Sequence, residues 1–288
     1  MANIKELKVR ISSTKSTLKI TSAMKLVSAA KLSRAQGNIQ SLKPYSNELD
    51  STIRTASALA DDYSHEFLEA GDSLRKAIVV ISSNKGLCGG YNSQLYKQVK
   101  RFMGENPDAD LLFMGRKVRE LAKRDGFKAT RDYVFEKAEP RYDEVVSVVN
   151  ELTELFKSGK YGEIYIAFNS FVSAIEFTPT VKPILPFSIT EAEKAELVKE
   201  FPVDFKYEPS AEVILDALIP EVLVMTVYAS VLDAIAAEHA SRMTAMDNAT
   251  NNSKDMIRTL TLKANKLRQA AITTELTEIV SGAESLNG

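Results

Sequence analysis

The feature that most constrains this chain is a stretch of 61 residues, residues 221–281, that contains no glycine and no proline. If this stretch forms one helix, it is ~90 Å long, because an α-helix rises about 1.5 Å per residue. A compact globule of 288 residues has a radius of gyration of ~19 Å and therefore a diameter of only ~50 Å. Such a helix must extend beyond the globule, and its apolar side then needs a partner.

The beginning of the chain offers that partner, because apolar residues recur there at alternating spacings of three and four. Eight of the twelve positions of this register are apolar: Ile4, Leu7, Ile11, Thr14, Leu18, Thr21, Lys25, Ser28, Leu32, Ala35, Ile39 and Leu42. Near the end of the chain, ten of sixteen positions are apolar: Met225, Tyr228, Leu232, Ile235, His239, Arg242, Met246, Ala249, Ser253, Met256, Leu260, Lys263, Leu267, Ala270, Thr274 and Thr277. These imperfect heptads predict that the two ends pair as a long antiparallel coiled coil. The alternative is ordinary bundle helices that fold over the middle of the chain.

The middle of the chain alternates segments typical of strands and helices. Seventeen of the 21 glycines and prolines lie between Gly71 and Pro220. We expect strands at residues 76–82, 110–115, 130–135 and 163–171, helices between them, and an edge strand or extended segment at residues 177–187. This alternation predicts a doubly wound α/β domain, with a mostly parallel sheet covered by helices on both faces.

We therefore expect three parts. They are an N-terminal stalk helix (residues 1–70), a central Rossmann-like α/β domain (residues 71–209) and a C-terminal stalk helix (residues 210–288). Residues 188–209 are interpreted as the connection back to the last helix, and Pro220 is expected at the first turn or at a kink of that helix.

Side chains suited to catalysis or metal binding are scarce. The single cysteine, Cys88, excludes an internal disulfide and a cysteine-cluster metal site, and there are only two histidines. A glycine-rich loop around Cys88 follows a strand and opens a helix, where phosphates can bind, but it matches neither common nucleotide-binding fingerprint. We favour a tight turn with a packed Cys88 thiol over a nucleotide site, and packing in the helix pair for His239.

Charge is concentrated at the beginning of the chain, although the whole chain carries a net charge of only −1. Residues 1–43 contain nine lysines and arginines against Glu6 alone, a net charge of +8. Three interpretations compete: an organellar transit peptide, a helix for nucleic acid or a membrane surface, and a helix that faces an acidic protein. A second apolar stripe favours the protein partner, because a helix with two stripes touches two neighbours; its members are Ile20, Ala23, Met24, Val27 and Ala30.

Four segments resemble the gamma subunits of F-type ATP synthases. They are residues 19–32 (KITSAMKLVSAAKL), 85–92 (KGLCGGYN), 242–250 (RMTAMDNAT) and 265–283 (NKLRQAAITTELTEIVSGA). The pattern IT-x-E-x-x-E-x-x-x-G-A-x-S, which is highly specific to this family, begins within the last segment at Ile272 and ends at Ser285. The resemblance covers essentially the whole chain, and begins so early that we expect the basic segment to be part of the shaft and not a presequence.

The resemblance implies a mechanical role without a catalytic site, cofactor or metal in the chain itself. The paired helices would be the central rotor shaft inside a ring of three alpha and three beta subunits. The middle domain would lie at the foot, beside the epsilon subunit and the c-ring, on the cytoplasmic face of a bacterial plasma membrane. The family pattern suggests contacts with the ring at Met24, Lys25, Lys31, Arg34, Arg268, Gln269, Thr273 and Glu275, and contacts at the foot at Tyr207 and Glu208.

Overall fold

The computed structural model describes residues 4–59, 65–69, 71, 73–135, 139–187, 189–201, 207–208 and 210–287. It divides into two compact units. One, the paired-helix unit, comprises Met1–Ser28 and Met243–Gly288, and the other, the central unit, comprises Ala29–Arg242. Two long helices, α1 (Ile4–Leu59) and α6 (Ala211–Asn287), each contribute to both units.

The central unit is built on a five-stranded sheet with the order β3-β2-β1-β4-β5. Strands β1 (Lys76–Ile81), β2 (Asp110–Met114), β3 (Ala129–Tyr133) and β4 (Glu163–Phe171) are parallel to their neighbours, and β5 (Phe177–Leu185) is an antiparallel edge strand. The expected mostly parallel α/β sheet and its edge strand are therefore confirmed. Two prolines lie within β5, which an edge position tolerates because only one side of the strand is hydrogen-bonded.

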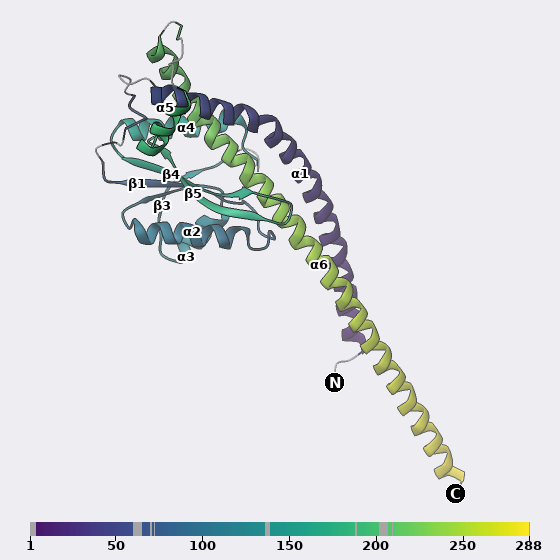
Figure 1. Cartoon of the computed structure of the whole chain (residues 1–288). Helices are drawn as coiled ribbons and strands as arrows, with labels where there is room; N and C mark the ends of the chain where they lie inside the picture. Colours follow the sequence, from purple (N-terminus) through teal and green to yellow (C-terminus); the bar gives the residue numbers. More distant parts are fainter. Residues whose placement is uncertain are drawn as a thin grey trace. The chain divides into compact units, whose positions relative to one another are not determined.

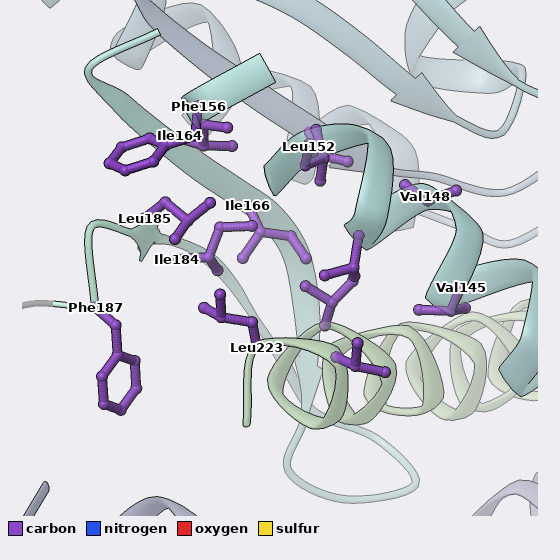
Figure 2. Close-up of a cluster of buried hydrophobic side chains, with 14 of the residues drawn as sticks. Val145, Val148, Leu152, Phe156, Ile164, Ile166, Ile184, Leu185, Phe187 and Leu223 are labelled. Carbon is purple, nitrogen blue, oxygen red and sulfur yellow. The ribbon is translucent and has the colours of Figure 1, made fainter. Parts of the chain in front are cut away.

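Helices cover both faces of this sheet (Figure 1). Helices α2 (Tyr91–Glu105) and α3 (Lys117–Arg124) pack on one face, around a cluster that includes Ile78, Leu95 and Phe113. The other face meets α4 (Tyr142–Lys157) and the central-unit parts of α1 and α6. Figure 2 shows this second core, where α4 side chains such as Leu152 meet β4, β5 and Leu223 of α6.

In the paired-helix unit, α1 and α6 run antiparallel, as the contacts between them show. Thr14 Oγ1 lies 3.8 Å from Met256 Sδ, and Thr21 Oγ1 lies 2.9 Å from Thr250 Oγ1, so residue numbers rise along one helix as they fall along the other. All twelve expected α1 positions are buried or half-buried. The antiparallel helix pair is therefore confirmed.

The α6 seam departs from the expected register after Met246. Ala249, Ser253, Leu260 and Leu267 are buried or half-buried as expected, but Thr250, Ile257 and Ala264 are shielded as well. Met256 and Lys263 are exposed. An ideal helix has 3.6 residues per turn and drifts ~20° per heptad from a strict seven-residue repeat. The shielded positions compensate for this drift with two successive spacings of four, from Arg242 to Met246 and from Met246 to Thr250.

The segments that connect the core elements differ more from the sequence prediction than the core elements themselves do. α1 ends at Leu59, and its Ile53 and Ala56 belong to the core of the central unit. Residues 188–209, expected to be a plain connection, contain a further helix, α5 (Glu191–Glu200). Of the two positions expected for Pro220, the first turn is wrong, because Pro220 lies well inside α6, which continues past it. A kink at Pro220 stays a prediction.

Helix α6 is the one described helix long and apolar enough, by length and composition alone, to cross a membrane. In the central unit its apolar side faces protein instead. Leu215, Ile219 and Val227 are fully buried in the sheet-facing core, and Ala236 and Ala237 are buried as well. The apolar composition of this part of α6 is thus explained by the core of the central unit.

Candidate functional site

Two of the three basic residues of α1 that are predicted to face a partner make ion pairs within the chain. In the paired-helix unit, Lys25 Nζ lies 2.7 Å from Asp247 Oδ1 of α6, and both side chains remain partly exposed. In the central unit, Lys31 Nζ lies 2.7 Å from Glu139 Oε1. A contact of either lysine with a second protein stays a prediction. Each lysine charge is already partly compensated by its internal ion pair.

Arg34 is placed differently. Its side chain is exposed on α1, and it makes no ion pair with any residue that the structure describes. Of the three cations predicted for this surface, Arg34 is therefore the one whose charge is fully available to a partner. Met24, one turn before Ser28, is half-buried.

The second apolar stripe of α1 does face outward. Ile20 and Val27 expose 59% and 58% of their surfaces, and neighbouring Leu26 exposes 68%. Exposing side chains of this size in a row is unfavourable unless another surface covers them. These three residues, together with Ala23, form what we call the α1 outer stripe.

The predicted contact residues near the end of α6 are all exposed: Arg268, Gln269, Thr273 and Glu275. The Thr273 hydroxyl donates to the Gln269 carbonyl at 3.0 Å, so this hydroxyl is engaged by its own helix. The antiparallel register places Ile4, the first described residue of α1, opposite the neighbourhood of Leu267. From Arg268 to Ala283 every residue is exposed, so α6 has no α1 neighbour there.

This last part of α6 also carries apolar side chains in the open. Ile272, Leu276, Ile279 and Val280 each expose at least half of their surface. Their spacing of three and four places them along one side of the helix, which is the pattern of a helix laid against an apolar partner. We call these four residues the α6 tip stripe.

The two predicted foot residues lie in the central unit, just before α6. Tyr207 is half-buried and packs against the sheet-facing core, whereas Glu208 is exposed. Burial in the core is a structural role for the Tyr207 ring, and a partner contact of either residue stays a prediction.

The glycine-rich loop around Cys88, residues 83–90, forms a packed turn. Leu87 and Gly89 both have positive φ values, 63° and 56°. Ser83 Oγ accepts a hydrogen bond from Asn92 Nδ2 at 2.8 Å, and burial raises the pKa of the Cys88 thiol. The cavity beside this loop measures about 30 Å³, room for a single water, whereas ligand pockets typically measure ~300 Å³ or more. The loop therefore has the structural role that the sequence favoured.

His239, expected to be packed in the helix pair, is buried and also holds a polar contact. Its Nε2 lies 3.2 Å from Glu139 Oε1, the same oxygen that pairs with Lys31. Burial lowers the pKa of His239, although Glu238 and Glu139 oppose this shift. Burial raises the pKa of Glu139, but the hydrogen bonds from Lys31 and His239 outweigh it, and the net pKa is lowered.

Sequence reasoning missed the partners of Arg242. This side chain is nearly buried, pairs with Glu238 at 2.7 Å, and donates from Nη2 to the backbone carbonyls of Lys85 and Gly86 at 3.2 and 3.3 Å. A charged residue at a seam position was the available signal, because a buried guanidinium must find acceptors. Among the described residues, no group of three histidine, cysteine or acidic side chains could hold a metal ion.

Comparison with known proteins places this architecture in a family. A family model described as ATP synthase matches residues 3–286. The ATP synthase gamma chain of Lachnoclostridium phytofermentans is 39% identical over 291 residues, and that of Bdellovibrio bacteriovorus is 40% identical over 297 residues. Both alignments cover 100% of this chain and 100% of the relative. The chain belongs to the ATP synthase gamma-chain family.

Solved structures agree with this membership. A chain from the central stalk and c-ring of the Tetrahymena thermophila mitochondrial ATP synthase matches 80% of this chain and 99% of its own, with a TM-score of 0.59 and 25% identity. A chain of the Euglena gracilis mitochondrial ATP synthase matches 98% of this chain and 94% of its own with a TM-score of 0.68, and its 18% identity shows the shared fold. As a gamma-chain family member, the protein has the role of a rotor shaft.

Proposed function

We propose that this chain is the shaft that couples ion-driven rotation of a c-ring to the nucleotide sites of three beta subunits, one copy per complex. The observation that carries this proposal is the outward apolar surface of the paired-helix unit. The α1 outer stripe and the α6 tip stripe are both exposed, and both belong to helices already committed to each other. Apolar surfaces of this kind call for a surrounding protein, and a ring of alpha and beta subunits supplies one.

The shaft would act through contacts that differ from one beta subunit to the next. The paired-helix unit has one apolar stripe on α1, basic side chains beside it, and a single apolar helix at its tip. No two sides of such a body are alike, so each of three surrounding subunits meets a different surface. A ligand or partner shifts a conformational equilibrium only by its differential affinity for the two states, and the turning shaft would supply that difference.

We propose that the chain itself carries no catalytic site, and that it works at the cytoplasmic face of a bacterial plasma membrane through its complex. The packed 83–90 loop and the lack of metal-ligand groups among the described residues support the first statement. The internal pairing of Lys25 and Lys31 weighs against the rival nucleic-acid function, because cations held by Asp247 and Glu139 are less available to phosphates.

Copurification tests this function. The chain, expressed with a tag in its own host, is expected to bring down alpha, beta and epsilon subunits, and the purified complex is expected to pump ions when given ATP. Replacing Ile272 and Leu276 of the α6 tip stripe with aspartate should reduce the recovery of alpha and beta. Aspartate at Lys266 and Thr259, two exposed positions of the same helix outside the stripe, is the matched control. Recovery of the chain without alpha and beta would contradict the proposal.

A further inference from the structure

A short segment of α6 near the end of the central unit makes polar contacts with a loop of the α/β fold. Arg242 donates from Nη2 to the carbonyls of Lys85 and Gly86, and Ser241 Oγ donates to the Cys88 carbonyl at 2.6 Å. About two turns before Ser241 on α6, the Ala234 carbonyl accepts a hydrogen bond at 3.0 Å from the hydroxyl of Tyr91, the residue that follows the loop. The 83–90 loop and the first residue of α2 are thus tied to α6 by directional bonds.

The loop that receives these bonds is itself well braced. The Asn92 amide donates to Ser83 Oγ at 2.8 Å and lies 3.1 Å from the Cys88 sulfur, and Cys88 is almost fully buried. Leu87 holds a positive φ of 63°, a conformation that a leucine adopts only where its surroundings impose it. Contacts from α6 therefore end on a braced loop at the carboxyl end of β1.

A second set of contacts reaches α6 from another direction. His239 Nε2 meets Glu139 Oε1 at 3.2 Å, and Lys31 of α1 pairs with the same oxygen at 2.7 Å. Successive residues of an α-helix are turned by about 100° from one another, so His239 and Ser241 lie about 160° apart around α6. By the same count Arg242 lies only about 60° from His239, so the Glu139 contact and the loop contacts leave α6 in more than one direction.

Most of the remaining contact between α6 and the sheet is apolar, although Tyr91 also bonds the Ala234 carbonyl and Ser170 Oγ donates to Asp233 Oδ2 at 3.1 Å. Between Leu215 and Ala237, α6 packs on the sheet through aliphatic side chains such as Val222, Val227 and Val231. Dispersion and hydrophobic contacts have no directional preference, so they resist separation of two surfaces more than rotation of one against the other. Hydrogen bonds weaken steeply with misalignment, so they resist rotation of the helix about its own axis.

We propose that the contacts of Arg242, Ser241 and His239, which we call the α6 clamp, transmit torque between the α/β fold and α6. Arg242 is a positioning residue of this clamp, and its ion pair with Glu238 holds the guanidinium toward the loop carbonyls. This inference rests on the proposed shaft function, because only a chain that carries torque needs α6 locked against rotation within its own domain.

The torsional stiffness of the assembled complex tests the clamp. The beta subunits are fixed to a surface, and a magnetic bead is attached to a cysteine introduced as Asp108→Cys, in the exposed turn between α2 and β2. Native Cys88 is only 2% exposed and stays unlabelled. In Arg242→Ala, the twist of the bead per unit of applied torque should rise about twofold or more, because the bonds that resist rotation are lost. Ser241→Ala should give a smaller rise.

Two further variants keep the outcome clear. Arg101→Ala removes an exposed arginine that forms an equivalent pair with Glu105 on α2, and it should leave the stiffness unchanged. If Arg242→Ala fails to assemble, Ser241→Ala and Arg242→Lys carry the test, and unchanged stiffness in both would overturn the clamp. If the wild-type complex rotates normally and all clamp variants keep the wild-type stiffness, the clamp is wrong but the shaft function stands. A wild-type chain that never joins alpha and beta overturns the shaft function and the clamp with it.

Discussion

The hydroxyl oxygens of Thr21 and Thr250 lie 2.9 Å apart inside the paired-helix unit, and both side chains are buried. A buried polar pair between two helices fixes their register, because a shifted pairing would leave a hydroxyl facing apolar neighbours. Each hydroxyl oxygen also lies near a carbonyl of its own helix, at Leu18 and Met246. The pair therefore contributes more to the choice of register than to stability.

We predict a measurable but modest coupling between these two threonines. Thr21→Val and Thr250→Val should each lower the free energy of unfolding by about 1 kcal/mol or less, since the remaining hydroxyl keeps its own helical carbonyl. The double variant should lose less than the sum of the single changes, which a double-mutant cycle from urea unfolding of the purified chain measures. Strictly additive losses would show that the two hydroxyls do not interact.

The three cations of α1 should separate into structural and partner-facing roles. Arg34→Glu should leave the unfolding free energy of the chain within about 0.5 kcal/mol, because an exposed side chain without an ion pair contributes little to folding. Its effect should appear as weaker coupling of ATP hydrolysis to ion pumping. Lys31→Glu faces Glu139 with a like charge and should also destabilise the central unit, although a partly exposed pair is worth only ~0–1 kcal/mol. Equal stability losses in both variants would contradict this division.

Inverting Lys25, Lys31 and Arg34 together should weaken coupling strongly, whereas single alanine substitutions should leave it nearly intact. Lys25 and Lys31 form ion pairs with Asp247 and Glu139. The triple inversion therefore needs a control variant that loses only these two internal ion pairs. Asp247→Lys combined with Glu139→Lys supplies it, because it breaks the same two pairs and keeps the three cations. Normal coupling of ATP hydrolysis to ion pumping in the triple variant would show that the three charges have no electrostatic role in coupling.

The stability of the central unit should fall as the solution becomes more acidic, through His239. Burial lowers the pKa of this histidine below its usual value of 6.5 in the folded chain. The unfolded chain therefore binds more protons in the window below pH 6.5, and stability that is full above this pH is lost as the pH falls through it.

His239→Gln measures that contribution directly. Between about pH 7 and about pH 5.5, the unfolding free energy of the wild-type chain should fall more steeply than that of the variant. The pKa of His65 is also lowered by burial and acts in the same direction, but it is present in both proteins and cancels in the comparison. The lowered pKa of Glu139 acts only below its usual value of 4.5, outside this window. Identical slopes in the two proteins would show that His239 does not titrate in this way.

Gly115 should tolerate no side chain. It follows β2 with a φ of 108°, and a Cβ built there would lie 2.0 Å from the backbone oxygen of Ser82. Gly115→Ala should therefore cost at least about 3 kcal/mol, because strain in φ adds to a clash with backbone that cannot move aside. Gly104 in α2 has nothing within 4 Å of such a Cβ, so Gly104→Ala should stabilise the chain by about 0.5–1 kcal/mol. Thermal unfolding of both variants checks the contrast.

The sequence predicted the parts of this fold whose rules are local. The strands of the sheet follow from short apolar runs between turn residues, and β1, β2 and β4 start where those runs start. The α1 seam follows from helical spacing, which burial of Leu7 and Leu32 confirms. Helix α5 was missed although its capping box, Thr190 with Glu193, is visible in the sequence, because charge and nearby prolines favoured a connection.

The contacts that define the α6 clamp could not be predicted from local sequence patterns. Arg242 and Lys85 are 157 residues apart, and their meeting depends on how α6 crosses the sheet. Glu139 joins Lys31 and His239 from a loop whose position no periodic pattern encodes. The exposed α6 tip shows the complementary case: the sequence marks Arg268 and Glu275 through family resemblance, while their contacts lie in a partner and stay a prediction.

The α6 tip should act as a bearing more than as the source of torque. Deleting residues 281–288 should leave rotation near normal. Deleting from Arg268 onward removes the α6 tip stripe, which should first lower the stability of the complex and only then its torque. A motor stopped by the shorter deletion alone would contradict the bearing role.

Rotation of the labelled chain inside the ring tests the shaft function most directly. The chain is assembled with the alpha and beta subunits of its own host, the beta subunits are fixed to a surface, and a bead is attached through Asp108→Cys. With ATP present, we expect the bead to turn continuously in one direction and to stop when ATP is removed. A complex that hydrolyses ATP at its normal rate while the labelled chain stays still relative to the ring would contradict the claim that this chain is the rotor shaft.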